Sequence, residues 1–148
     1  MRIYMDVCCL NRPFDDLSQD RINLEAEAVL SIISHCDKGE WTLVSSGIIE
    51  YELSKMPDID RLEKVQTLYA VAGEHIKLSI HAEQRAVYFV QNGLTPFDGL
   101  HLALAETSGV DVFLTTDDRL LRIANKTDLK IKVANPVSWL MEVMNYDL

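Results

Sequence analysis

Hydrophobic positions along the chain follow two periods, which predicts strands separated by helices. Apolar residues that recur every three or four positions, such as Ile22, Ala26, Val29 and Ile33, form one face of a helix. Short apolar runs between such segments predict strands at 2–5, 42–45, 76–80, 112–115 and 131–133. Further helices are expected through Tyr51 and Leu53, over 59–69, 81–92 and 95–106, and around Leu120 and Trp139.

Several boundaries of these elements are marked by capping and turn residues. Thr95 and Pro96 predict an N-cap and a first helical position, and glycines at 39, 73 and 109 mark helix ends. Asn11, Arg12 and Pro13 predict a loop after the first strand. Strands separated by helices imply right-handed crossovers, so the fold class is α/β with a mainly parallel sheet covered on both faces.

Composition narrows the class of protein without changing this fold. At 148 residues, with 48% hydrophobic and 25% charged residues, the chain suits one domain over 1–148. No apolar run approaches the roughly 20 residues that span a bilayer, and an early Asp6 interrupts any secretory signal, so we expect a cytoplasmic protein. Cys8, Cys9 and Cys36 suit neither a disulfide framework nor a zinc site.

Acidic residues follow three of the predicted strands, where parallel sheets gather their ligands. Asp6 ends the first strand, and Asp117 and Asp118 end the fourth. Asp98 lies in the first turn of the helix before the fourth strand, and Glu50 and Glu52 lie beyond the second. Converging carboxylates repel one another unless they bind cations, and their oxygens suit Mg²⁺ or Mn²⁺. Two such ions would support phosphodiester hydrolysis, although each acid taken alone also suits a helix N-terminus.

Four segments resemble the successive motifs of PIN-domain proteins. They combine these acids with an apolar frame, at 5–16, 51–53, 94–103 and 114–120, and Asn135-Pro136-Val137 resembles the closing segment of that family. The resemblance implies a three-layer α/β/α fold with about five strands. It also implies Mg²⁺- or Mn²⁺-dependent ribonuclease activity, often found in VapC-type toxins that a partner antitoxin holds inactive.

Carried over to this chain, the resemblance makes Asp6, Glu52, Asp98 and Asp117 the catalytic acids, with Asp6, Asp98, Asp117 and Asp118 as metal ligands. Glu52 is preferred over Glu50 because it precedes Leu53 in the Glu-Leu pair of the family. The expected partners are an RNA substrate, an antitoxin and a second copy of the chain in a homodimer that places two sites across one groove.

Other residues allow more than one interpretation. Arg12 and Arg119 are candidates for contact with RNA phosphates, although a solvated surface explains Arg119 equally well. His101 lies three residues after Asp98 on the same helix, where packing is the favoured role and metal binding or proton transfer the alternative.

The chain departs from the family where Val7 and Cys8 stand in place of a hydroxyl residue and Asn. Cys8 cannot supply the hydrogen bonds of an amide. This departure and the net charge of −9 favour an alternative, a catalytically inactive PIN fold that binds protein or RNA. Retention of four acids favours the active nuclease, because converging acids without metal destabilise the fold.

Overall fold

The computed structural model describes residues 1–146. Its centre is a sheet of five parallel strands in the order β3-β2-β1-β4-β5. The strands are β1 (Arg2–Met5), β2 (Thr42–Ser46), β3 (Glu74–Ile76), β4 (Val112–Leu114) and β5 (Lys132–Ala134). The predicted α/β class and mainly parallel sheet are confirmed.

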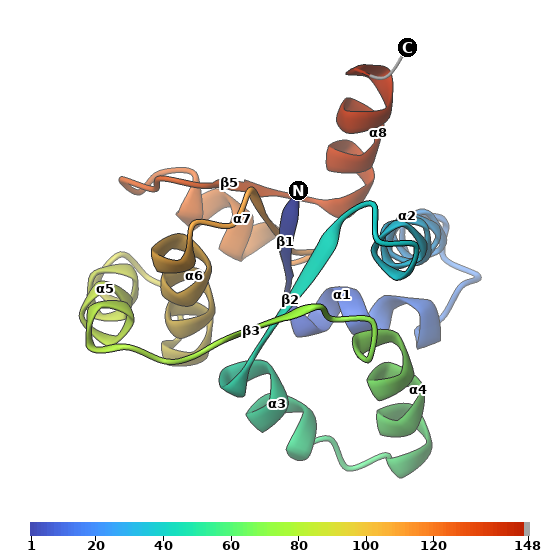
Figure 1. Cartoon of the computed structure of the whole chain (residues 1–148), viewed down its shortest axis with the longest axis horizontal. Coiled ribbons are helices and arrows are strands. Elements are labelled where there is room, and N and C mark those ends of the chain that lie inside the picture. The colour runs from blue at the N-terminus through green and yellow to red at the C-terminus, as the bar shows by residue number, and fades with distance from the viewer. Residues whose placement is uncertain (147–148) are drawn as a thin grey trace.

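Helices cover both faces of the sheet, as Figure 1 shows, and complete the predicted three layers. On one side lie α1 (Val7–Asn11), the 3-10 turn η1 (Arg12–Phe14), α2 (Asp20–Asp37) and α4 (Ile59–Tyr69). On the other lie α5 (Ile80–Gln91), α6 (Pro96–Ser108) and α7 (Asp118–Ala124). The remaining helices are α3 (Gly47–Ser54), at the carboxyl end of β2, and α8 (Pro136–Tyr146), which packs on α2.

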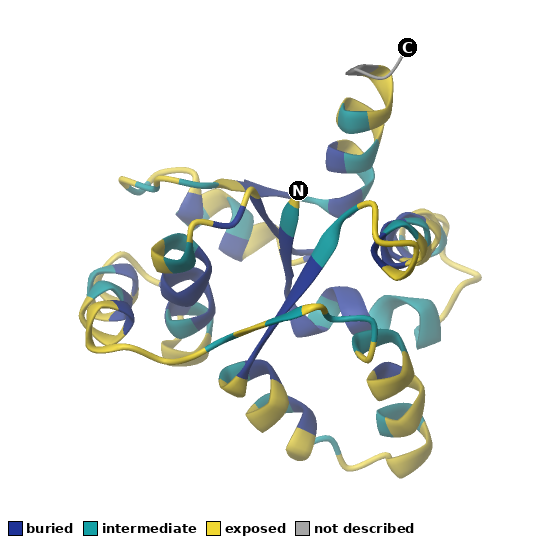
Figure 2. Cartoon of the chain, viewed as in Figure 1, coloured by how far each residue is buried: buried dark blue, intermediate teal, exposed yellow. Residues whose placement is uncertain are grey.

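The core lies between these layers. β1 and β4 are buried through Tyr4, Met5, Phe113 and Leu114, and the middle of α6 is buried, including 101–105 (Figure 2). Thr95 caps α6 by accepting a hydrogen bond from the backbone N–H of Asp98, and Gly109 ends the helix at a φ of 71°. Both predicted boundaries of α6 are therefore confirmed. Among the helices of residues 1–146, none has the length and apolar character needed to cross a bilayer.

Two predicted elements differ from the structure. The third strand was placed at 76–80, but β3 ends at Ile76, because β2 ends at Ser46 and offers no partner to the residues beyond. The alternating Ile76, Leu78 and Ile80 resemble a strand, yet Leu78 and Ile80 are exposed, and Ser79 caps α5 instead.

The loop predicted around Asn11, Arg12 and Pro13 is helical. Asp6 accepts a hydrogen bond from the backbone N–H of Val7 and so starts α1 directly after β1. Pro13 then occupies the start of η1, where its missing N–H leaves no hydrogen bond unmade.

Candidate active site

The candidate acids lie at the carboxyl ends of the central strands, where the sheet changes direction. From β1 the chain moves outward through β2 to β3, and from β4 it moves the other way to β5. Adjacent strands β1 and β4 are thus the switch point, where connections leave to opposite faces and open a crevice for ligands. Asp6 follows β1 directly, and Thr115, Thr116 and Asp117 follow β4.

The hydroxyl group of Thr115 connects the two sides of this switch point. It donates a hydrogen bond to Oδ2 of Asp6 over 3.0 Å and accepts one from the backbone N–H of Asp117 over 3.1 Å. Asp117 in turn caps α7 through Oδ1, which accepts from the backbone N–H groups of Arg119 and Leu120. A single threonine therefore fixes both loops that carry acids.

Asp98 lies between the other acids. Burial raises the pKa of its carboxyl group, and the negative charges of Asp117 and Glu52 raise this pKa further. Burial also raises the pKa of Asp6, and the charge of Asp98 is one of the nearby charges that add to this effect. Acids from four separate segments, after β1, in α3, in α6 and after β4, thus lie close enough to repel one another.

Glu52 is held in place by a chain of hydrogen bonds that runs through His101 to Tyr4. One of its carboxylate oxygens lies 2.5 Å from Nε2 of His101, and Nδ1 of the same ring lies 2.5 Å from the Tyr4 hydroxyl. His101 is fully buried, and it lies near enough to Asp98 to lower the pKa of that carboxyl. Its structural role is therefore to hold Glu52. Glu50 is exposed and lies 3.8 Å from His75 instead.

Cys8 stands where the family pattern has Asn, and its sulfur makes contacts at this position. Its Sγ lies 3.4 Å from Oδ2 of Asp6 and accepts a hydrogen bond from the backbone N–H of Thr116, also over 3.4 Å. Asn11 does not substitute for the missing amide, because its side chain bonds to the carbonyl of Val7 and to Arg61.

Three predicted residues have protein partners that compete with the roles expected of them. Asp118 forms a bidentate ion pair with Arg21, with both N–O distances 2.7 Å. Arg12 pairs with the buried Glu25 and with Asp15, and Arg119 donates to the carbonyl of Gly93. Metal binding by Asp118 and RNA contact by the two arginines remain predictions.

The donor set of the site fits a hard divalent cation by its chemistry, because it consists of carboxylate oxygens that repel one another. Within residues 1–146, no three His, Cys, Asp or Glu side chains are grouped closely enough to hold an ion as they stand. The oxygens of Asp6, Asp117 and Glu52 are instead engaged by Thr115, by backbone N–H groups and by His101. A cation would compete with these donors.

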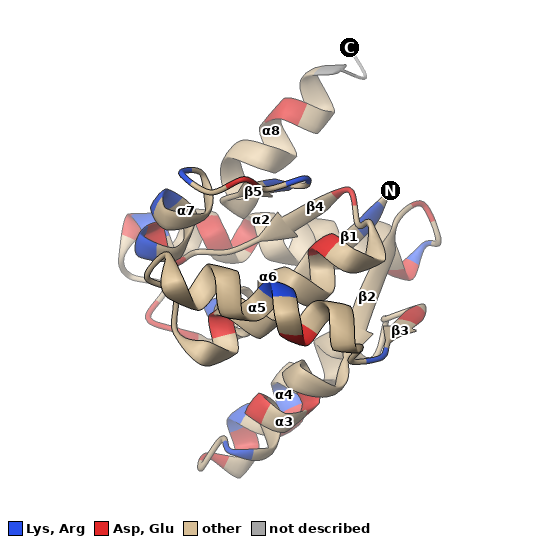
Figure 3. Ribbon diagram, turned by 90° about the vertical axis from the view of Figure 1, so that its left-hand side faces the viewer, with Lys and Arg blue, Asp and Glu red and all other residues tan. Residues whose placement is uncertain are grey.

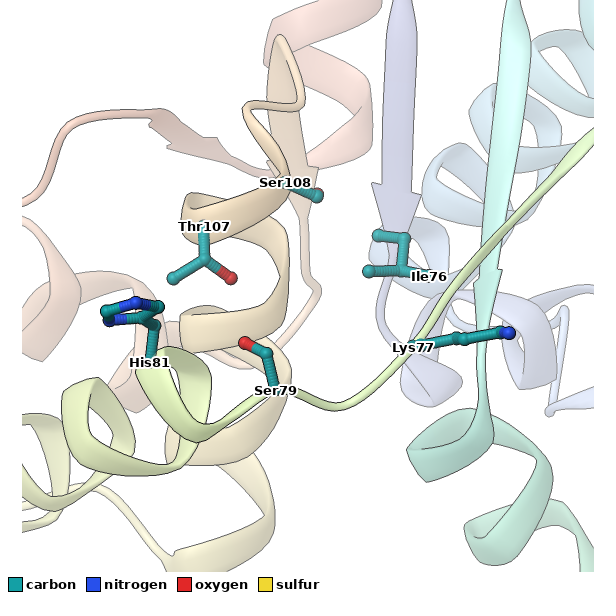
Figure 4. Close-up of a pocket in the computed structure, with 6 residues that line it drawn as sticks. All are labelled: Ile76, Lys77, Ser79, His81, Thr107 and Ser108. Atoms are coloured by element: carbon teal, nitrogen blue, oxygen red, sulfur yellow. The ribbon is translucent and has the colours of Figure 1, made fainter.

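A separate cavity of about 460 Å³ lies at the far end of α6, lined by Ile76, Lys77, Ser79, His81, Thr107 and Ser108. Figure 4 shows Ser79 and Thr107 turned toward each other, while Lys77 points away. Thr107 is nine residues from Asp98, about 14 Å along the helix at ~1.5 Å per residue. This cavity is therefore not part of the acidic site.

Comparison with known proteins decides the fold. The chain is similar to a chain in the crystal structure of VapBC2 from Rickettsia felis bound to a DNA fragment from their promoter, with a TM-score of 0.58 and 16% identity over 91% of this chain and 98% of that one. It is also similar to PAE2754 from Pyrobaculum aerophilum, with a TM-score of 0.59 and 15% identity over 98% and 90% of the two chains. The fold is that of a PIN domain.

The resemblance that the four sequence segments predicted is thus confirmed at the level of the PIN fold. At these low identities the likeness is one of architecture. No family model matches the sequence, and no curated protein matches it.

Proposed function

We propose that this PIN-fold chain is a metal-dependent ribonuclease that cleaves RNA phosphodiester bonds with Asp6, Glu52, Asp98 and Asp117. The observation that carries this proposal is the link through Thr115 between Asp6 and Asp117 at the carboxyl ends of β1 and β4. Asp98 lies close enough to this pair for the charge of Asp117 to raise its pKa after burial, and the charge of Glu52 adds to the effect. A half-buried carboxyl group among other carboxyl groups destabilises the apo fold, and a divalent cation relieves that repulsion.

Each acid has a role in this proposal. Asp6, Asp98 and Asp117 hold Mg²⁺ or Mn²⁺, with Asp118 as an additional ligand if it leaves Arg21. When bound, such a metal would supply a Lewis acid for a water molecule and for the charge on the phosphate. Glu52, fixed by His101, takes the proton of the water that attacks phosphorus, in the manner of a general base. The P–O bond to the ribose oxygen opposite the water breaks, and that oxygen leaves with a proton from solvent.

The experiment is a calorimetric titration of the metal-free chain with Mn²⁺, followed by an RNA cleavage assay with and without the metal. Asp98→Asn should weaken Mn²⁺ binding and cleavage at least about 100-fold, because groups that only orient metal ligands already cost roughly 10–100-fold when they are lost. Circular dichroism should show an unchanged fold, since Asn keeps the shape of the side chain.

Asp60→Asn is the matched control. Asp60 also lies in the first turn of a helix, α4, but it is exposed and outside the acidic site. Both variants lose a carboxylate that stabilises a helix N-terminus, and they differ in whether that carboxylate belongs to the acidic site. Cleavage that survives Asp98→Asn removes Asp98 from the mechanism. Absence of Mn²⁺ binding by the unaltered chain favours the catalytically inactive module that binds protein or RNA.

We also propose that the chain acts in the cytoplasm as the toxin of a toxin–antitoxin pair. The similarity to a chain of the VapBC2 complex supports this step. Expression of the chain alone in a bacterial host should then arrest growth, and expression of the Asp98→Asn variant to the same level should not. Equal growth of both cultures, with soluble protein present, would count against the toxin role.

A further inference from the structure

Two exposed aromatic rings lie beside the acidic site. Tyr51 immediately precedes Glu52 on α3, and Phe97 immediately precedes Asp98 on α6. Their ring centroids are 5.5 Å apart with an interplanar angle of 29°, so the rings stack across the two helices. We call Tyr51 and Phe97 the aromatic platform.

The aromatic platform remains open to solvent despite this stacking. Tyr51 is 47% exposed and Phe97 is 42% exposed, whereas Tyr4 and Phe113, which also stack, are fully buried. Exposed ring surface of this size costs free energy unless a ligand covers it. Figure 2 shows the surrounding outer surface of α3 as exposed.

A cation completes the aromatic platform. Nζ of Lys55 lies 5.0 Å from the centroid of the Tyr51 ring, one helical turn further along. Lys55 is exposed, so it can turn from the ring to a phosphate at little cost. Aromatic rings for bases beside a cation for the backbone are the parts with which proteins bind single-stranded nucleic acid.

Charge favours a nucleotide over a protein partner as the occupant. An apolar protein surface laid on the rings would also bury the ammonium group of Lys55 and crowd the neighbouring carboxylates, which is costly for unpaired charges. A stacked base covers only the rings. The phosphate of the nucleotide, the ammonium group of Lys55 and the carboxylates all stay in water.

We propose that Tyr51 and Phe97 bind an unpaired base of the RNA substrate by stacking, with Lys55 at the adjoining phosphate. This inference rests on the proposed ribonuclease function and adds the side chains that hold a base next to the cleaved bond. A base in a duplex is already stacked on both faces and cannot reach the rings without leaving the helix. The acids then receive the phosphate on the other side of that nucleotide.

The experiment measures binding of a fluorescein-labelled single-stranded RNA octamer by anisotropy in EDTA, where no metal is present to support cleavage. The double variant Tyr51→Leu/Phe97→Leu should lose about 10-fold or more in affinity, which is the loss of one base–aromatic stack. The matched control is the exchanged pair Tyr51→Phe/Phe97→Tyr, which keeps two aromatic rings and should bind like the unaltered chain. A duplex of the same sequence should bind weakly and equally to all three proteins.

Separate outcomes overturn the two proposals. Equal affinity of the leucine and exchanged variants, or no binding by the unaltered chain, overturns the aromatic platform, while Mn²⁺-dependent cleavage can still hold. RNA binding that depends on the rings without Mn²⁺-dependent cleavage overturns the nuclease and keeps the aromatic platform. A lower molecular mass of the leucine variant in sedimentation, at unchanged RNA affinity, identifies the rings as a contact between protein chains instead.

Discussion

Asp6 is a single residue of the acidic site whose burial destabilises the folded state. The carboxyl group is almost fully buried, and burial raises its pKa above the value it has in the unfolded chain. A charged Asp6 therefore costs the folded state free energy that the unfolded state avoids by placing the charge in water. The hydrogen bonds from Val7 and Thr115 offset only part of this cost.

Asp6→Asn should accordingly stabilise the metal-free fold at pH 8 by about 1 kcal/mol, within the ~0.5–2 kcal/mol that single stabilising substitutions commonly yield. Because the folded pKa of Asp6 is raised, the folded state of the parent binds the proton more tightly. The parent thus gains stability as pH falls through the folded pKa toward about 4, the unfolded value. Thermal unfolding in EDTA should show the gap between the two proteins narrowing over this range. A variant that is less stable than the parent at pH 8 would contradict this account.

Single residues also show which parts of the site a sequence can predict. Asp98 and His101 are three apart on a helix, so their shared face follows from helical geometry. The link from His101 to Glu52 does not, because it joins residues 49 positions apart through the packing of α3 on α6. Arg12 illustrates the same limit, since its two carboxylate partners become neighbours only when α2 and η1 pack together.

At the scale of elements, the position of Asp98 depends on how closely α6 approaches α5. Gly99 lies at this contact, and a Cβ added there would be 3.1 Å from both the carbonyl oxygen of Ala86 and Cγ2 of Val90. The backbone carbonyl cannot move without shifting α5. The two helices therefore depend on a residue without a side chain directly beside the acid.

Gly99→Ala should destabilise the fold by roughly 1 kcal/mol. Overpacking costs ~1–3 kcal/mol and outweighs the gain of about 1 kcal/mol in helix propensity. Gly47→Ala is the control, because a Cβ at the first residue of α3 meets no atom within 4 Å. Chemical denaturation of both variants tests the difference, and equal midpoints would show that the α5–α6 contact yields without cost.

The elements themselves were predicted unequally. Strands β1, β2 and β4 lie close to their predicted positions because nearly all of their residues are buried, and each contains a short apolar run that local periodicity detects. The edge strand β3 was predicted too far along the chain, since its extent depends on where its neighbour β2 ends. Information of that kind resides in the pairing of strands and not in local periodicity.

At the scale of the whole molecule, charge and topology act together. In the view of Figure 3, Lys and Arg are scattered among Asp and Glu and form no continuous basic stretch, in keeping with the net charge of −9. That face therefore offers no broad electrostatic clamp, and the proposed binding of RNA would depend on a few local contacts. The order of the strands could not be read from the sequence, because α/β chains with one rhythm of elements adopt several orders.

The acids belong to elements of different stability, so we expect one part of the site to unfold before the rest. Asp6 and Asp117 are anchored on the buried central strands, whereas Glu52 belongs to a short helix that buries only Ile49 and Leu53. Regions with few buried contacts open by local fluctuations at a lower free energy than the whole domain. Detachment of α3 would carry Glu52 away from the other acids while the sheet stays intact. In the proposed nuclease, heating should thus abolish cleavage at a lower temperature than it unfolds the domain.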